Sequence, residues 1–172
     1  MSQDDQQAVV WFRKAAEQGQ GRAQYNLGTM FEEGLGVAQS FAEARKWYYE
    51  AAQKGSARAQ FRLGMMSHEG AGVPLDYAKA AGLFKAAAMQ GLPEAQYRLG
   101  VMFSDGYGEK RDYAQAYKWF TLAMVQGEPN ASSRLKILVP MMDQGQVDLA
   151  KKMIKAWKPK KSVFSRTAIV RR

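Results

Sequence analysis

The sequence predicts an all-α protein, a solenoid of about four 36-residue helix-pair repeats that opens in the middle of a repeat and ends in a divergent capping pair of helices. Three segments repeat nearly the same residues at a spacing of 36: AQYNLGTMFEEGLGV at 23–37, AQFRLGMMSHEGAGV at 59–73 and AQYRLGVMFSDGYGE at 95–109. Self-similarity at a fixed period of about 20 to 50 residues is the signature of stacked repeat architectures. Positions fixed in all copies are expected to serve the repeat, and positions that vary are free to bind a partner.

The first element is a helix over residues 6–18 that matches the second half of a repeat. Trp11, Phe12 and Ala15 stand one period before the equivalent residues of the later copies and form its apolar packing stripe. Asp4 is placed to accept hydrogen bonds from the free amides of the first turn, as an N-cap does. The chain therefore opens halfway through a repeat.

Each full repeat begins with a helix that we call helix A. In the first copy Ala23, Leu27, Met30 and Gly34 are spaced i, i+4, i+7 and i+11, which is one stripe of an amphipathic helix. Every copy also has a glycine in the middle of this helix, where glycine costs about 1 kcal/mol relative to alanine, so we expect close approach of a neighbouring helix. The central glycines are Gly28, Gly64 and Gly100.

The second helix of each repeat, helix B, carries a bulkier stripe. Ala44, Trp47, Tyr48 and Ala51 are spaced i, i+3, i+4 and i+7. A GxG segment joins the two helices and supplies residues that can take positive φ and turn the chain. The N-caps expected for helix B are Ser40, Asp76 and Asp112, with Ser40 and Glu43 forming a capping box.

The last pair of helices departs from the repeat. Ala131 and Leu135 keep the spacing of helix A, and Pro140 interrupts that helix. A final helix has an apolar stripe on one face and lysines on the other, which suits the cap that a solenoid needs at its end. The stripe consists of Val147, Ala150, Ile154 and Trp157, and the lysines are Lys151, Lys152, Lys155 and Lys158.

Composition limits the functional classes. The 172 residues contain no cysteine, so a disulfide framework, a thiolate nucleophile and a cysteine metal site are excluded. No run approaches the roughly 18 to 20 apolar residues that cross a bilayer, and MSQDDQQAVV lacks the pattern of a signal peptide. We expect a cytoplasmic protein, or an exported one if an upstream signal peptide has been removed.

The net charge of +9 is concentrated at the C-terminus. The first 150 residues balance, and the last 22 contain nine basic residues and no acid. We therefore divide the chain into a solenoid, 1–157, and a basic tail, 158–172. One functional hypothesis is an electrostatic tether in which this tail binds nucleic acid, an anionic membrane surface or an acidic partner. Its binding residues would be Lys158, Lys160, Lys161, Arg166, Arg171 and Arg172.

The pattern AxxxLGxxFxxGxGVxxxxxEAxxWxxxAAxxG, as it stands in residues 23–55, closely resembles the Sel-one-like repeat family, which is related to the tetratricopeptide repeats. The resemblance covers roughly residues 4–127. It implies a right-handed α/α superhelix whose A helices line a concave surface, and a role as a scaffold or adaptor for other proteins. The chain lacks the cysteines of some relatives, and Ser67 replaces the aromatic residue found at Phe31 and Phe103.

No catalytic or metal site is predicted. Ser67, His68 and Glu69 contain the residue types of a catalytic triad, but adjacent residues point about 100° apart on a helix and cannot form a relay. We expect His68 to be an ordinary surface histidine, and a lone histidine without cysteine does not suit zinc. The GxG segments follow helices rather than strands, which favours turn formation over phosphate binding. The prediction is a protein without enzymatic activity, cofactor or metal.

The leading hypothesis is a scaffold that binds a protein or peptide segment along the variable strip of the A helices. Opposite the packing stripe, residues spaced i, i+4 and i+7 would form one exposed strip per helix, and stacked strips would form a groove. In register at the end of this strip stand Glu33, Glu69 and Asp105, for which a bond to the next turn or repeat is favoured over a partner-binding acidic row. The predicted partner-binding residues are Arg22, Asn26, Arg58, Arg62, Met65, Arg98 and Val101, with Arg62 and Arg98 pairing with partner carboxylates.

The N-terminal end is predicted to be a second interaction surface. The helix A that would precede residues 6–18 in a full repeat is missing from the sequence, so one side of Trp11 and Phe12 is left uncovered. Exposed apolar patches of this kind often mark interfaces. We predict self-association through this helix, with a two-fold homodimer as the simplest closed form.

Overall fold

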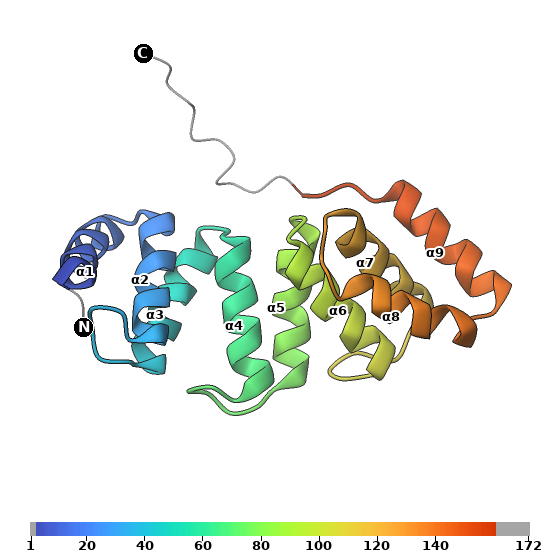
Figure 1. Cartoon of the computed structure of the whole chain (residues 1–172), viewed down its shortest axis with the longest axis horizontal. Helices are drawn as coiled ribbons and strands as arrows, with labels where there is room; N and C mark the ends of the chain where they lie inside the picture. The colour runs from blue at the N-terminus through green and yellow to red at the C-terminus, as the bar shows by residue number, and fades with distance from the viewer. Residues whose placement is uncertain (1–2, 161–172) are drawn as a thin grey trace, which may run out of the picture.

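The computed structural model describes residues 3–160, and this part of the chain consists of nine α-helices and one 3₁₀ turn without any strand. The helices follow one another in a row, with α1 at one end and α8 and α9 at the other (Figure 1). The all-helical prediction is therefore confirmed. In chain order the elements are α1 (Gln3–Glu17), α2 (Gly21–Glu33), α3 (Phe41–Gln53), α4 (Ala57–Glu69), α5 (Tyr77–Met89), α6 (Pro93–Asp105), α7 (Tyr113–Val125), α8 (Ala131–Leu138), η1 (Val139–Met141) and α9 (Gln144–Ala156).

The helices pair as antiparallel hairpins. The A helices α2, α4 and α6 pack against their own B helices α3, α5 and α7, and each of α1, α3 and α5 also packs against the following helix A. Each repeat thus contacts its neighbours in sequence, which is the arrangement of a solenoid. Within residues 3–160, no helix is long and apolar enough to cross a lipid bilayer.

The predicted close approach at the central glycines is confirmed. A Cβ atom on Gly28 would lie 2.7 Å from the ring of Tyr48, and one on Gly100 would lie 2.7 Å from the ring of Phe120. The same relationship holds in the middle repeat between Gly64 and Phe84. Because glycine has no side chain, the bulky ring of helix B rests directly on the backbone of helix A and is completely buried there.

The second glycine of each GxG segment joins neighbouring repeats. Gly36 lies against the backbone of Asp5 in the first turn of α1, where there is no room for a Cβ atom. Gly72 and Gly108 lie in the same way against Phe41 of α3 and Tyr77 of α5. The loop after each helix A is therefore seated on the N-terminal turn of the preceding helix B.

The N-caps of the B helices follow the prediction with two corrections. The side chains of Ser40, Asp76 and Asp112 each accept a hydrogen bond from the backbone amide three residues on. At Ser40 only this half of the capping box is present in the described structure, and a complete box forms instead at Asp143. Asp4 is not an N-cap, because α1 begins at Gln3 and includes Asp4 in its first turn, where an acid is favoured by the helix dipole.

The C-terminal pair forms the predicted cap. Helix α8 gives way to η1 around Pro140, and α9 packs on α7 with Ala150 buried and its lysines exposed. Trp157 ends α9 and packs edge-on against Trp119, with ring centroids 6.5 Å apart. The backbone amide of Lys160 then donates to the carbonyl of Met89 at the end of α5 (2.7 Å), so residues 158–160 run back along the solenoid (Figure 1).

The structure corrects the packing stripe of α1. Val9 and Ala16 are buried and Phe12 is half-buried, but Trp11 is 69% exposed. Its counterparts in the later B helices, Trp47 and Trp119, are 8% and 3% exposed. The difference arises because, among residues 3–160, α1 packs chiefly on α2, whereas α3 packs on both α2 and α4, and α7 packs on α6, α8 and α9.

Candidate partner-binding site

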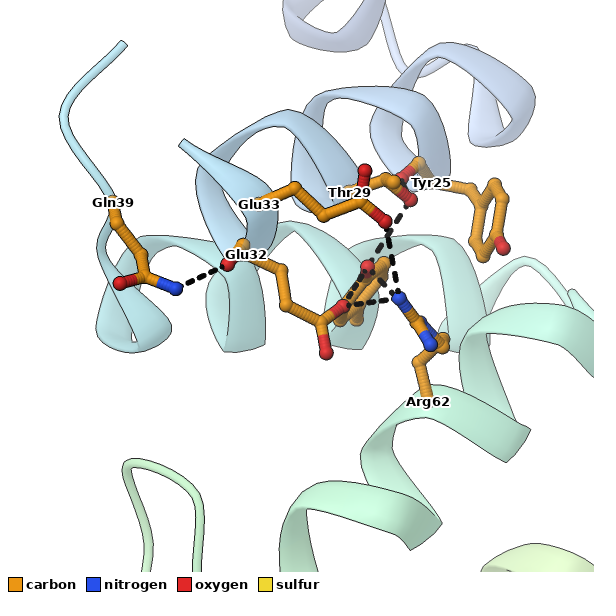
Figure 2. A network of polar contacts seen from close by, with 7 residues as sticks. Tyr25, Thr29, Glu32, Glu33, Gln39 and Arg62 are labelled. Carbon is orange, nitrogen blue, oxygen red and sulfur yellow. Dashed lines mark hydrogen bonds and ion pairs between the residues drawn. The ribbon is translucent and has the colours of Figure 1, made fainter. Parts of the chain in front are cut away.

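Arg62 was predicted to pair with a partner's carboxylate, and the structure shows it engaged within the chain. Its guanidinium lies 3.0 Å from the carboxylate of Glu32 and 3.6 Å from that of Glu33, both in the preceding helix A. Figure 2 shows Arg62 reaching from α4 toward these two acids of α2. The Nε of Arg62 also donates to the hydroxyl of Tyr48 at 3.5 Å. Arg62 therefore binds two helices of the previous repeat to α4.

Tyr48 is the centre of this polar network. Its hydroxyl donates to Glu32 at 2.5 Å and lies 3.1 Å from Thr29 Oγ1. Burial raises the pKa of Tyr48 above its ordinary value, and the Arg62 hydrogen bond opposes this rise while Glu32 adds to it. For Arg62, burial alone would lower the pKa, but Tyr48 and Glu32 outweigh it and raise the pKa. The phenol thus stays protonated and the guanidinium stays charged.

The network is specific to the first repeat junction. In the next repeat Phe84 stands in the place of Tyr48, and His68 stands in the place of Glu32. Arg98, which corresponds to Arg62, is half-buried and has no ion-pair partner among residues 3–160. The two arginines that the repeat makes equivalent therefore differ in availability.

Three of the seven predicted residues meet in one cavity. Arg22, Asn26 and Arg58 line a recess of about 670 Å³ between α2 and α4. The first residues of α4 and the connection from α5 into α6 also line it. The remaining lining residues are Tyr25, Ser56, Ala57, Gln90, Gly91, Leu92 and Pro93. Arg62, Met65, Arg98 and Val101 are not among the lining residues of this cavity.

The cavity suits an anionic group. It presents two exposed guanidinium groups, Arg22 and Arg58, and no carboxylate belongs to its described lining. The Oε1 atom of Gln90 is buried and has no hydrogen-bond partner in the described part of the chain, while its Nε2 donates to Gln60. Pro93 and the ring of Tyr25 add apolar surface beside these polar groups.

Sequence reasoning missed the far wall of this cavity. Residues 90–92 connect α5 to α6 and Pro93 begins α6, and Gly91 occurs at a position that is glycine in every repeat. Fixed turn positions carry no signal of binding, because the turn alone accounts for them. Met65 and Val101, by contrast, are half-buried and pack against the core that surrounds Phe84 and Phe120.

The three in-register acids do not share a role. Glu33 pairs with Arg62 of the next repeat, which agrees with the structural explanation for that position. Asp105 instead accepts a hydrogen bond from Ser104 (2.8 Å), and the exposed Glu69 has no ion pair within residues 3–160.

His68 is not the surface histidine that the sequence suggested. Its ring is half-buried and lies edge-on to Tyr77 at 5.3 Å, and its Nδ1 has no hydrogen-bond partner among the described residues. The buried Ser67 donates to the carbonyl of Leu63, and Glu69 is exposed, so these three side chains form no relay. Within residues 3–160, no group of three or more His, Asp or Glu residues is arranged to hold a metal ion.

The basic tail lies mostly beyond the described residues. Lys158 and Lys160 are exposed. Lys161, Arg166, Arg171 and Arg172 lie outside residues 3–160, and the division of the chain at residue 157 stays a prediction.

Successive αα-hairpins that each pack on the next define an α-solenoid repeat protein. In this one, a recess is lined by residues of three successive repeats. The model of the Sel1 repeat family matches residues 1–20, 21–56, 57–92 and 93–124, and the chain belongs to this family. The matched units begin where α2, α4 and α6 begin, and the opening half repeat receives its own match. Sel1 repeat proteins are generally protein-interaction scaffolds, and their fold is typically non-catalytic.

Two solved structures are similar to this chain. One is a Sel1 repeat protein from Oxalobacter formigenes, with 34% identity and a TM-score of 0.70 over 74% of this chain and 96% of that one. The other is c5321, a protective antigen of uropathogenic Escherichia coli strains displaying an SLR fold, with 28% identity and a TM-score of 0.63 over 95% of this chain. This chain spans 44% of the length of c5321. The search of curated proteins gave no match.

Proposed function

We propose that this protein is a non-enzymatic scaffold that binds an acidic segment of a partner protein in the cavity between α2 and α4. The observation that supports this proposal is the meeting of Arg22, Asn26 and Arg58 in one recess of about 670 Å³ without a carboxylate in its described lining. Carboxylates of the partner would pair with the two guanidinium groups, which bind such groups in bidentate geometry.

The position of the cavity fits a peptide better than a small molecule. Its lining residues come from α2, from the start of α4 and from the connection into α6, and so belong to three successive repeats. A chain that extends from the cavity across α6 would also meet Arg98, which takes part in no ion pair within residues 3–160. Arg62 would contribute little to such a chain, because Glu32 and Glu33 already neutralise it.

A labelled peptide of six glutamates tests the proposal by fluorescence anisotropy with the full chain. We expect binding that weakens with salt, and a loss of at least about tenfold in the Arg22→Glu/Arg58→Glu variant, since two attractive contacts become repulsive. Both arginines are exposed and take part in no ion pair within residues 3–160, so this variant should melt like the wild type.

The matched control makes the same change in net charge at two residues far from the cavity. Lys151→Glu/Lys152→Glu alters two exposed lysines of α9 and should leave peptide binding within about twofold, as expected for distant charges screened by salt. Equal loss in both variants would assign the binding to overall charge and contradict a site at Arg22 and Arg58.

A further inference from the structure

A second cavity lies between the B helices α3 and α5, with α4 as its floor. Its volume is about 430 Å³. None of its lining residues belongs to the cavity between α2 and α4. They are Arg45, Lys46, Tyr49, Glu50, Leu63, Met66, Ser67, Val73, Lys79 and Leu83.

Two large-to-small replacements produce this cavity. In the first repeat its place is filled by Phe31 and Trp47, each 8% exposed. In the third repeat it is filled by Phe103 and Trp119, which are 9% and 3% exposed. The middle repeat has Ser67 and Leu83 at these two positions, and both line the cavity.

The volume left open in the middle repeat is therefore the volume that aromatic side chains occupy in the other two repeats. The surrounding apolar residues Leu63, Met66 and Val73 have the same types as Leu27, Met30 and Val37 at the equivalent positions of the first repeat, which pack in the same core cluster as Phe31. Removing large side chains from a packed layer leaves a void when the neighbours do not collapse. Here the neighbouring helices have not closed the gap, since a void of about 430 Å³ remains between α3 and α5.

The rim of the cavity is basic. Arg45 and Lys46 of α3 and Lys79 of α5 stand around it, opposed by the single acid Glu50. Among residues 3–160 none of these three cations takes part in an ion pair. A neighbouring recess shares Arg45, Val73 and Lys79 with the cavity and adds one acid, Asp76, and Leu75, which is 55% exposed. The apolar hole thus opens beneath a positively charged and partly apolar surface.

We propose that this cavity is a second docking site, which takes an aromatic side chain from an acidic segment of a partner protein. The aromatic ring would occupy the volume that phenylalanine and tryptophan fill in the other two repeats. Flanking carboxylates would pair with Arg45, Lys46 and Lys79. The site lies on the B helices and does not depend on the binding proposed for Arg22 and Arg58.

The probe is a labelled pentapeptide with a central phenylalanine between two acidic residues on each side, and its partner peptide has alanine at the centre. Binding is measured by fluorescence anisotropy with the full chain carrying Arg22→Glu/Arg58→Glu, so that the other cavity does not contribute. We expect the phenylalanine peptide to bind at least about tenfold more tightly than the alanine peptide, as buried aromatic anchors do.

The decisive variant is Ser67→Phe, which restores the residue of the other two repeats and fills the cavity. It should fold, because Phe31 and Phe103 occupy the same position, and should weaken the phenylalanine peptide by at least about tenfold. Ser132→Phe, at an exposed position of α8, is the matched control and should bind like its parent.

Charge variants provide an independent readout. Lys79→Glu should weaken the phenylalanine peptide several-fold, whereas Lys110→Glu, on the exposed loop before α7, should not. If Ser67→Phe does not fold, the comparison of peptide binding by Lys79→Glu and by Lys110→Glu tests the proposal instead. The proposal would be overturned if the two peptides bind with equal affinity or do not bind. It would also be overturned if neither Ser67→Phe nor Lys79→Glu weakens binding of the phenylalanine peptide. None of these outcomes bears on the site at Arg22 and Arg58.

Discussion

The guanidinium of Arg62 lies 3.0 Å from the carboxylate of Glu32, and this ion pair joins α4 to the helix A of the preceding repeat. Both side chains are partly shielded from water, with 30% and 18% of their surface exposed. The hydroxyl of Tyr48 bonds to both of them and so ties helix B into the same junction. Within residues 3–160 this network occurs at the first repeat junction and not at the next, because Phe84 and His68 replace Tyr48 and Glu32 there.

Arg62 and Arg98 should respond differently to the same substitution. Arg62→Glu places a third acid beside Glu32 and Glu33 and leaves the Tyr48 hydroxyl without its donor, so we expect a loss of about 1–3 kcal/mol in the free energy of unfolding. Arg98→Glu removes no ion pair within the described residues and should change it by less than about 0.5 kcal/mol. Urea denaturation of the two variants measures this, and equal stability would show that the junction network contributes nothing.

Gly100→Ala and Gly82→Ala should have opposite signs. A Cβ atom on Gly100 would lie 2.7 Å from the Phe120 ring, so the two helices must separate and stability should fall by about 1–3 kcal/mol. Gly82 is exposed within α5, and nothing lies within 4 Å of the position of its Cβ. Alanine there should stabilise the protein by about 0.5–1 kcal/mol through helix propensity alone. Thermal melts of both variants test the contrast, and a stabilising Gly100→Ala would contradict the close packing.

Leu63→Ala and Leu99→Ala should both lower the free energy of unfolding, but by different amounts. Each removes a core leucine of helix A, for which about 2–5 kcal/mol is expected. Leu99 is fully buried, whereas Leu63 is 8% exposed and borders the cavity of about 430 Å³. Less packing is lost at the site that already faces a void, so Leu99→Ala should be the more destabilising. Equal denaturation midpoints for Leu63→Ala and the wild type would show that its packing stripe is misassigned.

Self-association through α1 stays a prediction, and the exposure of Trp11 makes it straightforward to test. Trp11 is 69% exposed and its neighbour Val10 is 52% exposed, so together they present an apolar patch at this end of the described solenoid. Light scattering should show a dimer of the wild type at a protein concentration on the order of tens of micromolar, where a weak interface becomes populated. The Trp11→Glu variant should be a monomer under the same conditions. Because Trp11 is not part of the core, the variant should melt like the wild type, and a monomer in both proteins would remove the interface.

The repeated elements of the fold were predictable from the sequence because they depend on local spacing. The stripe of Leu27 and Met30 defines helix A, Ser40 marks the start of helix B, and Gly28 indicates the close approach of a neighbouring helix, for which the structure supplies Tyr48. Each of these features involves residues within one period, and the threefold recurrence separates the signal from chance. The same reasoning placed Arg22, Asn26 and Arg58 on one face.

The sequence by itself thus determined the helices, their pairing and the order of the repeats, whereas the side-chain contacts between helices were decided by the tertiary structure. Arg62 lies opposite Glu32, thirty residues earlier, because the stacking of the repeats brings α4 within side-chain reach of α2, and no spacing within one helix encodes that pairing. His68 became half-buried because the following helix supplies Tyr77, and Trp11 stayed exposed because the neighbour that buries Trp47 has no counterpart at α1 in residues 3–160. The cavity at Ser67 and Leu83 has the same origin: two separate replacements, each harmless in its own helix, face each other only when α4 and α5 pack together.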